Sequence, residues 1–139
     1  MLCVPVTDDQ GRAIGAIQVV NSHTGQTFTQ QDIDLLTAFR SYVQITVLNR
    51  QQYLMGLTGI LDVDASNIDL AFLGDRVVEL VKAERGTIFI LDENEDGTRF
   101  LYFIIDTPNG KKEMTIPYGA KSMAGASMIY NEIINIEDW

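Results

Sequence analysis

The fold is decided by two neighbouring segments, Ile14-Gly15-Ala16-Ile17-Gln18-Val19-Val20-Asn21 and Phe28-Thr29-Gln30-Gln31-Asp32-Ile33-Asp34-Leu35-Leu36. The first is apolar and rich in β-branched residues, which favours a strand that is buried on at least one face. We expect Asn21 to end this strand. Thr29 is followed three residues later by Asp32, which is typical of a helix start because a threonine hydroxyl accepts a hydrogen bond from a free amide of the first turn. The stretch therefore predicts a strand, a turn and a capped helix.

The same patterns predict the elements around this stretch. Five strands are expected, at 2–6, 13–20, 87–91, 99–105 and 112–116. Helices are expected at 29–53 and 68–83, and a short capped helix begins at Ser122. Apolar residues recur at helical spacing along both long helices: Leu36, Phe39, Val43, Thr46 and Val47 in the first, and Phe72, Leu73, Val77, Leu80 and Val81 in the second. We expect Gly86 to end the second helix in a left-handed conformation.

Length and charge limit the classes of protein. The chain has 139 residues, enough for one domain, and a formal net charge of −9 that disfavours contact with nucleic acid or an anionic membrane. No apolar run approaches the roughly 20 residues that span a bilayer, and no signal peptide is expected. Cys3 is the single cysteine, so no internal disulfide is possible and a cytoplasmic location is expected.

The residues offer no catalytic set, and we expect no enzymatic activity. His23, the single histidine, lies in a turn without a recognisable orienting partner, and Cys3 lies in an apolar strand where we expect an unreactive thiol. The acidic run Asp92-Glu93-Asn94-Glu95-Asp96-Gly97 lacks the spacing of a calcium loop, so a solvated hairpin turn is the preferred interpretation. We expect no metal site.

Several segments together carry a family resemblance. They are Asn21, Phe28 and Asp32 after the first strand, the strand from Glu84 to Asp92, the segment Ser122-Met123-Ala124-Gly125 and the ending Asn135-Ile136-Glu137-Asp138. In this combination the chain resembles a GAF domain, the sensor module of cyclic-nucleotide phosphodiesterases, adenylyl cyclases and bacterial signalling kinases. The family signature Asn-Lys-Phe-Asp-Glu is partly kept, since Ser22 stands at the lysine and Ile33 at the glutamate. The resemblance implies that Asn21, Phe28 and Asp32 support the fold.

The order of the segments differs from that of one ordinary GAF domain. Residues 1–53 resemble its C-terminal half and residues 54–139 its N-terminal half. Either the chain spans the junction of two tandem domains or it is a circular permutant. In both cases we expect one α+β, GAF-like and PAS-related unit, with an antiparallel sheet of about five to six strands. The two long helices would cover one face and a small ligand pocket the other, with residues 1 and 139 close together at its mouth.

The resemblance also implies a ligand and a partner. Thr87, Ser122, Met123, Ala124, Gly125 and Ala126 would contact a small ligand, with cAMP or cGMP as leading candidates and no required cofactor. The domain would relay binding to an effector such as a cyclase, phosphodiesterase or kinase. A first alternative is a ligand-free dimerisation module, through homodimers or exchanged half-domains, which the partial signature favours. Apolar residues outside the main stripe are consistent with it: Ile45, Leu48, Tyr53, Leu54 and Leu57. A second alternative, a bilin-binding photosensor, needs a cysteine that residues 118–136 lack.

Overall fold

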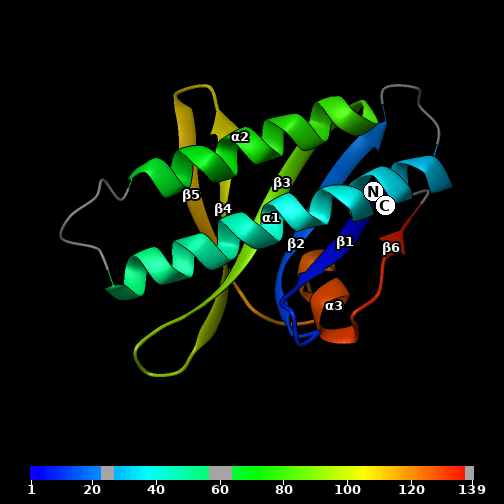
Figure 1. The fold of residues 1–139 in the computed structure, drawn as a ribbon. Coiled ribbons are helices and arrows are strands. Elements are labelled where there is room, and N and C mark those ends of the chain that lie inside the picture. Colours follow the sequence, from blue (N-terminus) through cyan, green and yellow to red (C-terminus); the bar gives the residue numbers. More distant parts are fainter. Residues whose placement is uncertain (23–26, 57–63, 137–139) are drawn as a thin grey trace.

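A hairpin of two apolar strands begins the fold in the computed structural model, which describes residues 1–22, 27–56 and 64–136, with the backbone alone at 49–56 and 64–69. Strand β1 (Leu2–Thr7) pairs antiparallel with β2 (Ala13–Ser22), as the alternation of the sequence predicts. Two long helices follow, α1 (Gln30–Gly56) and α2 (Asp64–Val81), which lie side by side in Figure 1. The remaining elements are β3 (Ala83–Glu93), β4 (Arg99–Thr107), β5 (Gly110–Pro117), α3 (Met123–Tyr130) and β6 (Ile134–Asn135).

All six strands form one antiparallel sheet, in the order β5-β4-β3-β2-β1-β6. The pairing of β2 with β3 joins the two segments that the sequence assigns to opposite halves of a GAF domain, and Ile17 lies opposite Ile88 at its centre. The α+β fold with its sheet of five to six strands is therefore confirmed, and it is consistent with a GAF-like fold.

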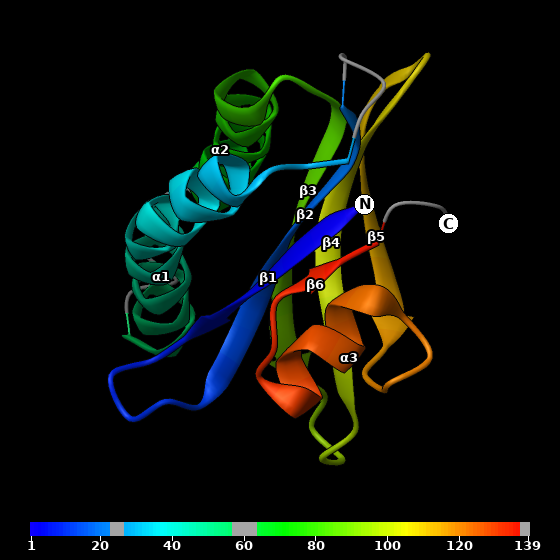
Figure 2. The same cartoon turned by 90° about the vertical axis from the view of Figure 1, so that its right-hand side faces the viewer.

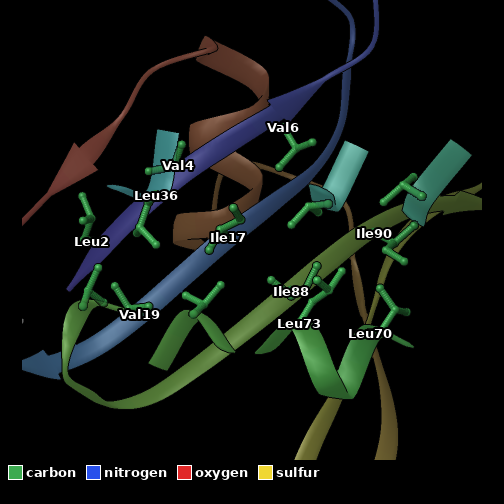
Figure 3. Close-up of a cluster of buried hydrophobic side chains, with 14 of the residues drawn as sticks. Leu2, Val4, Val6, Ile17, Val19, Leu36, Leu70, Leu73, Ile88 and Ile90 are labelled. Carbon is green, nitrogen blue, oxygen red and sulfur yellow. The ribbon is translucent and has the colours of Figure 1, made fainter. Parts of the chain in front are cut away.

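The helices α1 and α2 cover one face of the sheet, and their contact layer is the main core (Figure 2). Alternate strand residues point into it, so that Leu2, Val4 and Val6 of β1 face the helices while their neighbours face the other side. Figure 3 shows Leu36 of α1 in this layer, close to Val4 of β1. Burial of this layer is the principal driving force for the two segments to close on each other.

The short helix α3 covers the opposite face (Figure 2). Its Ala124 and Met128 pack on Cys3, Ala16 and Phe89 in a second, smaller cluster. Burial raises the pKa of the Cys3 thiol to about 12, although a hydrogen bond with Ser127 opposes the shift. The expectation of an unreactive core thiol is in agreement with this environment.

Helix α1 begins with the predicted capping arrangement. The Thr29 amide donates to the Asp32 carboxylate at 2.8 Å, and the Asp32 amide donates to the Thr29 hydroxyl at 3.3 Å. Of the predicted stripe, Leu36, Val43 and Val47 are fully inaccessible. Phe39 and Thr46 are only half-buried, and the Thr46 hydroxyl donates to the Tyr42 carbonyl at 3.0 Å within the helix. Helix α3 likewise begins at its predicted cap, Ser122.

The prediction for α2 is wrong in part. Leu70, Leu73, Val77 and Val81 form its buried stripe, whereas Phe72 and Leu80 are 57% and 38% exposed. Successive residues turn by about 100° around a helix, so once Leu73 faces the sheet its neighbour Phe72 must point outward.

The predicted helix end at Gly86 is also wrong, because β3 already begins at Ala83. Lys82 is the left-handed residue after α2, with a φ of 53°. Gly86 instead lies inside β3, where a Cβ would stand 2.8 Å from Cγ2 of Val78. The glycine therefore allows α2 to approach the strand closely.

Asn21 does not end the β2 strand as predicted, since Ser22 still pairs with Ala83. Asn21 adopts a left-handed conformation with a φ of 57°, which asparagine tolerates better than most residues. Its side-chain amide donates to the Glu84 carboxylate of β3 at 3.0 Å, so Asn21 ties the two strands together at an irregular point.

Strand β6, which the sequence did not predict, brings the two ends of the described chain together. The Met1 nitrogen donates to the Ile136 carbonyl at 2.9 Å, and the Ile136 amide donates to the Met1 carbonyl at 2.8 Å. The Asn135 side-chain amide also donates to the Phe28 carbonyl at 2.9 Å. The expected proximity of the ends is thus present at residues 1 and 136, while Trp139 lies outside the described residues.

Candidate functional site

Strands β3 and β4 are paired along only part of their length. Residues Ile90 to Glu93 pair with Arg99 to Tyr102, whereas β3 before residue 90 is paired with β2 alone. Beyond Tyr102, β4 continues beside β5 up to Thr107. The two strands consequently diverge, and the sheet opens between them at the end near Met1.

A cleft of about 570 Å³ lies at this divergence, which we call the β3–β4 cleft. Its size falls within the roughly 300–1,000 Å³ that is usual for small-molecule sites. Its lining comes from β2, β3, β4, β5 and α2, together with residue 1: Met1, Gln18, Val20, Leu70, Ala71, Gly74, Asp75, Val78, Glu84, Arg85, Gly86, Thr87, Ile88, Ile104, Ile105, Asp106 and Lys111. The cleft therefore combines aliphatic walls with a few polar groups.

Two polar side chains of the cleft lie next to each other. Gln18 of β2 and Thr87 of β3 are register partners, and both lie on the face that also carries Phe89, opposite α1 and α2. Both are half-buried, and neither side chain makes a hydrogen bond within the described part of the chain. Since half-buried polar groups usually find a partner, the pair is suited to hydrogen-bond a ligand.

Arg85 adds a positive charge on the same face, two residues before Thr87. Its register partner is Val20, so Arg85 stands next to the Gln18–Thr87 pair on two adjacent strands. Neighbouring positions across the two strands are about 5 Å apart, and positions two residues apart along one strand are about 7 Å apart. A guanidinium favours phosphate or carboxylate, because its planar donors match their oxygens.

An ion-pair network stands at the mouth of the cleft. The Lys111 ammonium of β5 lies 2.5 Å from a carboxylate oxygen of Asp106 and 3.7 Å from one of Asp75 on α2. The hydrogen bond that the Lys111 ammonium donates to Asp106 and the negative charge of Asp75 raise the pKa of Lys111 above its ordinary value. All three side chains are largely exposed, so the network links α2 to the β4–β5 hairpin without adding much stability.

The structure brings only one of the predicted ligand residues to this cleft, namely Thr87. The segment from Ser122 to Ala126 begins α3, which packs on β1 and β2. Ser122 accepts the Gly125 amide at 3.0 Å, and Ala124 and Gly125 are buried, while Met123 and Ala126 are half-buried. A Cβ on Gly125 would overlap the Gly119 carbonyl oxygen, so this glycine is required for packing. The role of residues 122–126 in ligand contact stays a prediction.

The three motif residues make contacts within the fold. Asn21 donates to Glu84, Asp32 completes the cap of α1, and Phe28 is buried in the core beneath the helices. The supporting role that the resemblance implies for these three residues stays a prediction.

Sequence reasoning missed Gln18, Arg85, Lys111 and Asp75 as site residues. Gln18 is the one polar residue in the apolar strand predicted at 13–20. That polar position could have indicated a site residue from the sequence alone. The others come together only through the divergence of β3 from β4 and the position of α2, neither of which is visible in the spacing.

No group of three or more histidine, cysteine or acidic side chains in the described residues is arranged to hold a metal ion. Within the same residues, no helix is long and apolar enough to cross a membrane. The acidic run Asp92–Gly97 covers the end of β3 and the hairpin turn that follows, in which the Asn94 amide donates to the Thr98 carbonyl at 2.8 Å. His23 lies outside the described residues.

Comparison with known proteins gives a partial match. The chain is similar to the cGMP-specific 3′,5′-cyclic phosphodiesterase of Drosophila melanogaster, with 24% identity over 124 residues that cover 78% of this chain and 11% of the relative. The same enzyme of Drosophila mojavensis is 23% identical over 132 residues, covering 84% of this chain and 12% of the relative. The chain therefore spans about a tenth of the length of these relatives. No family model and no solved structure matches it.

Proposed function

We propose that this chain is a regulatory sensor domain that binds a cyclic nucleotide, cAMP or cGMP, in the β3–β4 cleft. The observation that carries the proposal is the pair Gln18 and Thr87, half-buried and without hydrogen-bond partners among the described residues, beside Arg85 in a cleft of suitable size. The similarity to a small part of cGMP-specific phosphodiesterases supports this class of ligand.

The cleft contains the groups that a cyclic nucleotide requires. The Arg85 guanidinium would hold the phosphate, since it is the cleft's exposed cation with no carboxylate contact in the described chain. Gln18 offers both a donor and an acceptor, and Thr87 offers a hydroxyl, so together they can hydrogen-bond the edge of a base or the ribose. Aliphatic residues such as Ile105 would cover the flat face of the base.

Relay of binding would follow the contact between β3 and α2. Gly86 follows Arg85 directly, and its missing side chain lets Val78 of α2 lie against the strand. A ligand that shifts β3 at this position also displaces α2, which packs along α1. The long helices would carry the change to an effector domain such as a cyclase, phosphodiesterase or kinase.

We infer that a tandem arrangement accounts for the order of the halves. The matched region covers 78% of this chain, more than either half alone, which supports the inference. We therefore favour a chain that spans the junction of two GAF-like domains over a circular permutant. In a longer protein, each half would form a sheet either with the other half, as in this structure, or with the neighbouring half of its own domain.

Isothermal titration calorimetry of the full chain with cGMP and with cAMP tests the function. We expect saturable binding of at least one nucleotide, and we expect Thr87→Val to weaken it because the variant keeps the shape but loses the hydroxyl. Thr115→Val is the matched control, since Thr115 is an exposed threonine of β5 outside the cleft. Flat traces for both nucleotides on folded protein would refute the proposal.

A second function, ligand-free dimerisation, is favoured by one observation. Tyr42 and Ile45 of α1 are 63% and 57% exposed although both are large and apolar. Leu48 instead packs against the core, and the side chains of Tyr53, Leu54 and Leu57 lie outside the described part. Sedimentation equilibrium would show self-association that Ile45→Glu abolishes, whereas a monomer at every concentration would eliminate this alternative.

A further inference from the structure

A second groove lies at the other end of the sheet from the β3–β4 cleft. It is bounded by the β1–β2 turn, the ends of β3 and β4 and the last turn of α3, which meet at the same end of the molecule in Figure 2. Its volume is about 920 Å³, and it is lined by Asp8, Gly11, Arg12, Ala13, Ile14, Leu91, Arg99, Tyr118, Met128, Ile129 and Asn131. We call it the arginine groove, because two of the ten basic residues of this acidic chain line it.

The turn between β1 and β2 holds Arg12 in place. One carboxylate oxygen of Asp8 accepts the amides of Gln10 and Arg12, each at 2.9 Å, and the other accepts Nε of Arg12 at 3.0 Å. These hydrogen bonds, led by that from the Arg12 amide, lower the pKa of Asp8. Asp8 is the one acidic side chain among the described residues lining the groove, and its oxygens are engaged in the turn. The two terminal nitrogens of Arg12 are left to meet a ligand.

A different contact holds Arg99. Its guanidinium lies 5.0 Å from the centre of the Tyr118 ring, and the Tyr118 amide donates to the Arg99 carbonyl at 3.3 Å. Stacking on an aromatic ring leaves the nitrogens at the edge of a guanidinium free to donate. In the described chain, no carboxylate forms an ion pair with Arg99.

Apolar side chains form the floor between the two arginines. Met128 is a buried member of the second core cluster, Leu91 and Ala13 are partly buried against that cluster, and all three line the groove. Ile129, which also lines it, is 45% exposed. A methionine surface adapts to flat ligands of varied outline. The groove thus presents cationic donors above an apolar base.

From this arrangement we propose that the arginine groove binds a planar aromatic compound bearing a phosphate or carboxylate group. The two guanidinium groups bind the oxyanion, and the ring lies on the apolar floor beside Tyr118. This site is separate from the β3–β4 cleft and does not depend on cyclic-nucleotide binding.

Titration of the isotopically labelled full chain with phenyl phosphate, followed by amide NMR, tests the proposal. We expect shifts at Arg12, Arg99 and Tyr118 and none at Thr87. Inorganic phosphate should bind at least about tenfold more weakly, because it makes no contact with the apolar floor. Benzoate in a parallel titration distinguishes a carboxylate ligand from a phosphate ligand. No shifts with either aromatic anion, or equal binding of inorganic phosphate, would overturn the proposal.

Two variants give the control. Arg99→Gln should lower the affinity for phenyl phosphate by about tenfold or more, because one charge-assisted contact is lost. Arg76→Gln is the control and should leave the affinity for phenyl phosphate unchanged, because Arg76 lies on α2 outside the groove. Like Arg99, Arg76 lies over an aromatic ring, 5.6 Å from the centre of Phe72, and it also pairs with Glu79. Equal effects of the two variants would refute a specific site. Displacement of phenyl phosphate by saturating cGMP would show that the two sites are one.

Discussion

Replacement of Ile17 by alanine tests whether the two halves of the chain form one cooperative core. Ile17 is fully buried in β2 and lies opposite Ile88 of β3, the strand contributed by the other half. The change removes three buried carbon atoms, which corresponds to roughly 2.4 kcal/mol of transfer free energy at about 0.8 kcal/mol per carbon. The cavity left beneath the helices raises the expected loss of unfolding free energy to about 3–4 kcal/mol.

The assay is urea unfolding followed by circular dichroism, at several protein concentrations to exclude exchange between chains. Ile88→Ala should lower the unfolding free energy by a similar amount. The double variant should lose at least about 0.5 kcal/mol less than the sum of the two single losses, because the two cavities share walls. Ile133→Ala, at a position that is 43% exposed, is the control and should change stability by less than about 0.5 kcal/mol. Additive losses, or two separate unfolding transitions, would refute a single core.

Three further predictions concern single residues. Ser122→Ala removes the acceptor at the start of α3 and should lower unfolding free energy by about 1 kcal/mol, whereas Ser122→Asp should keep the cap; thermal unfolding measures both. Since Asp106 and Asp75 raise the pKa of Lys111 in the folded protein, its stabilising contribution is present below the ordinary value of 10.5 and is lost as pH rises through the higher folded value. The unfolding free energy of Lys111→Gln should therefore fall less steeply with pH above 10.5 than that of the unchanged protein. The same pH dependence in both proteins would contradict the ion-pair network. Cys3, with a pKa of about 12, should resist a thiol reagent at pH 8 until the protein unfolds.

Much of the fold could be predicted because local chemistry and tertiary packing agree there. The cap at Thr29 and Asp32, the alternation along β2 and the stripe of α1 each specify their element without help from distant residues. The α2 stripe shows the limit of this reasoning. Phe72 is as apolar as Leu73, and only the position of the sheet decides which of the two is buried.

The candidate site was harder to predict than the fold. Thr87 was identified through resemblance, but its neighbour Gln18 lies across a strand pairing between the two halves of the chain. The β3–β4 cleft exists because two strands separate after four paired positions, and backbone twist of this kind leaves no trace in residue spacing. Gly86 was assigned to a helix end because glycine serves equally for turns and for close approach.

The pairing of β1 with β6 has a mechanical consequence. Leu2 lies opposite Asn135 and Cys3 opposite Ile134, so any polypeptide attached before residue 1 and after residue 136 leaves the molecule at one corner. Tension applied through two such attachments would act across the hydrogen bonds of this pair and break them one after another, starting with those between Met1 and Ile136. Under tension β6 would separate from β1 first, and α3 would detach from the sheet with it. The pairing of the central strands would be lost only afterwards.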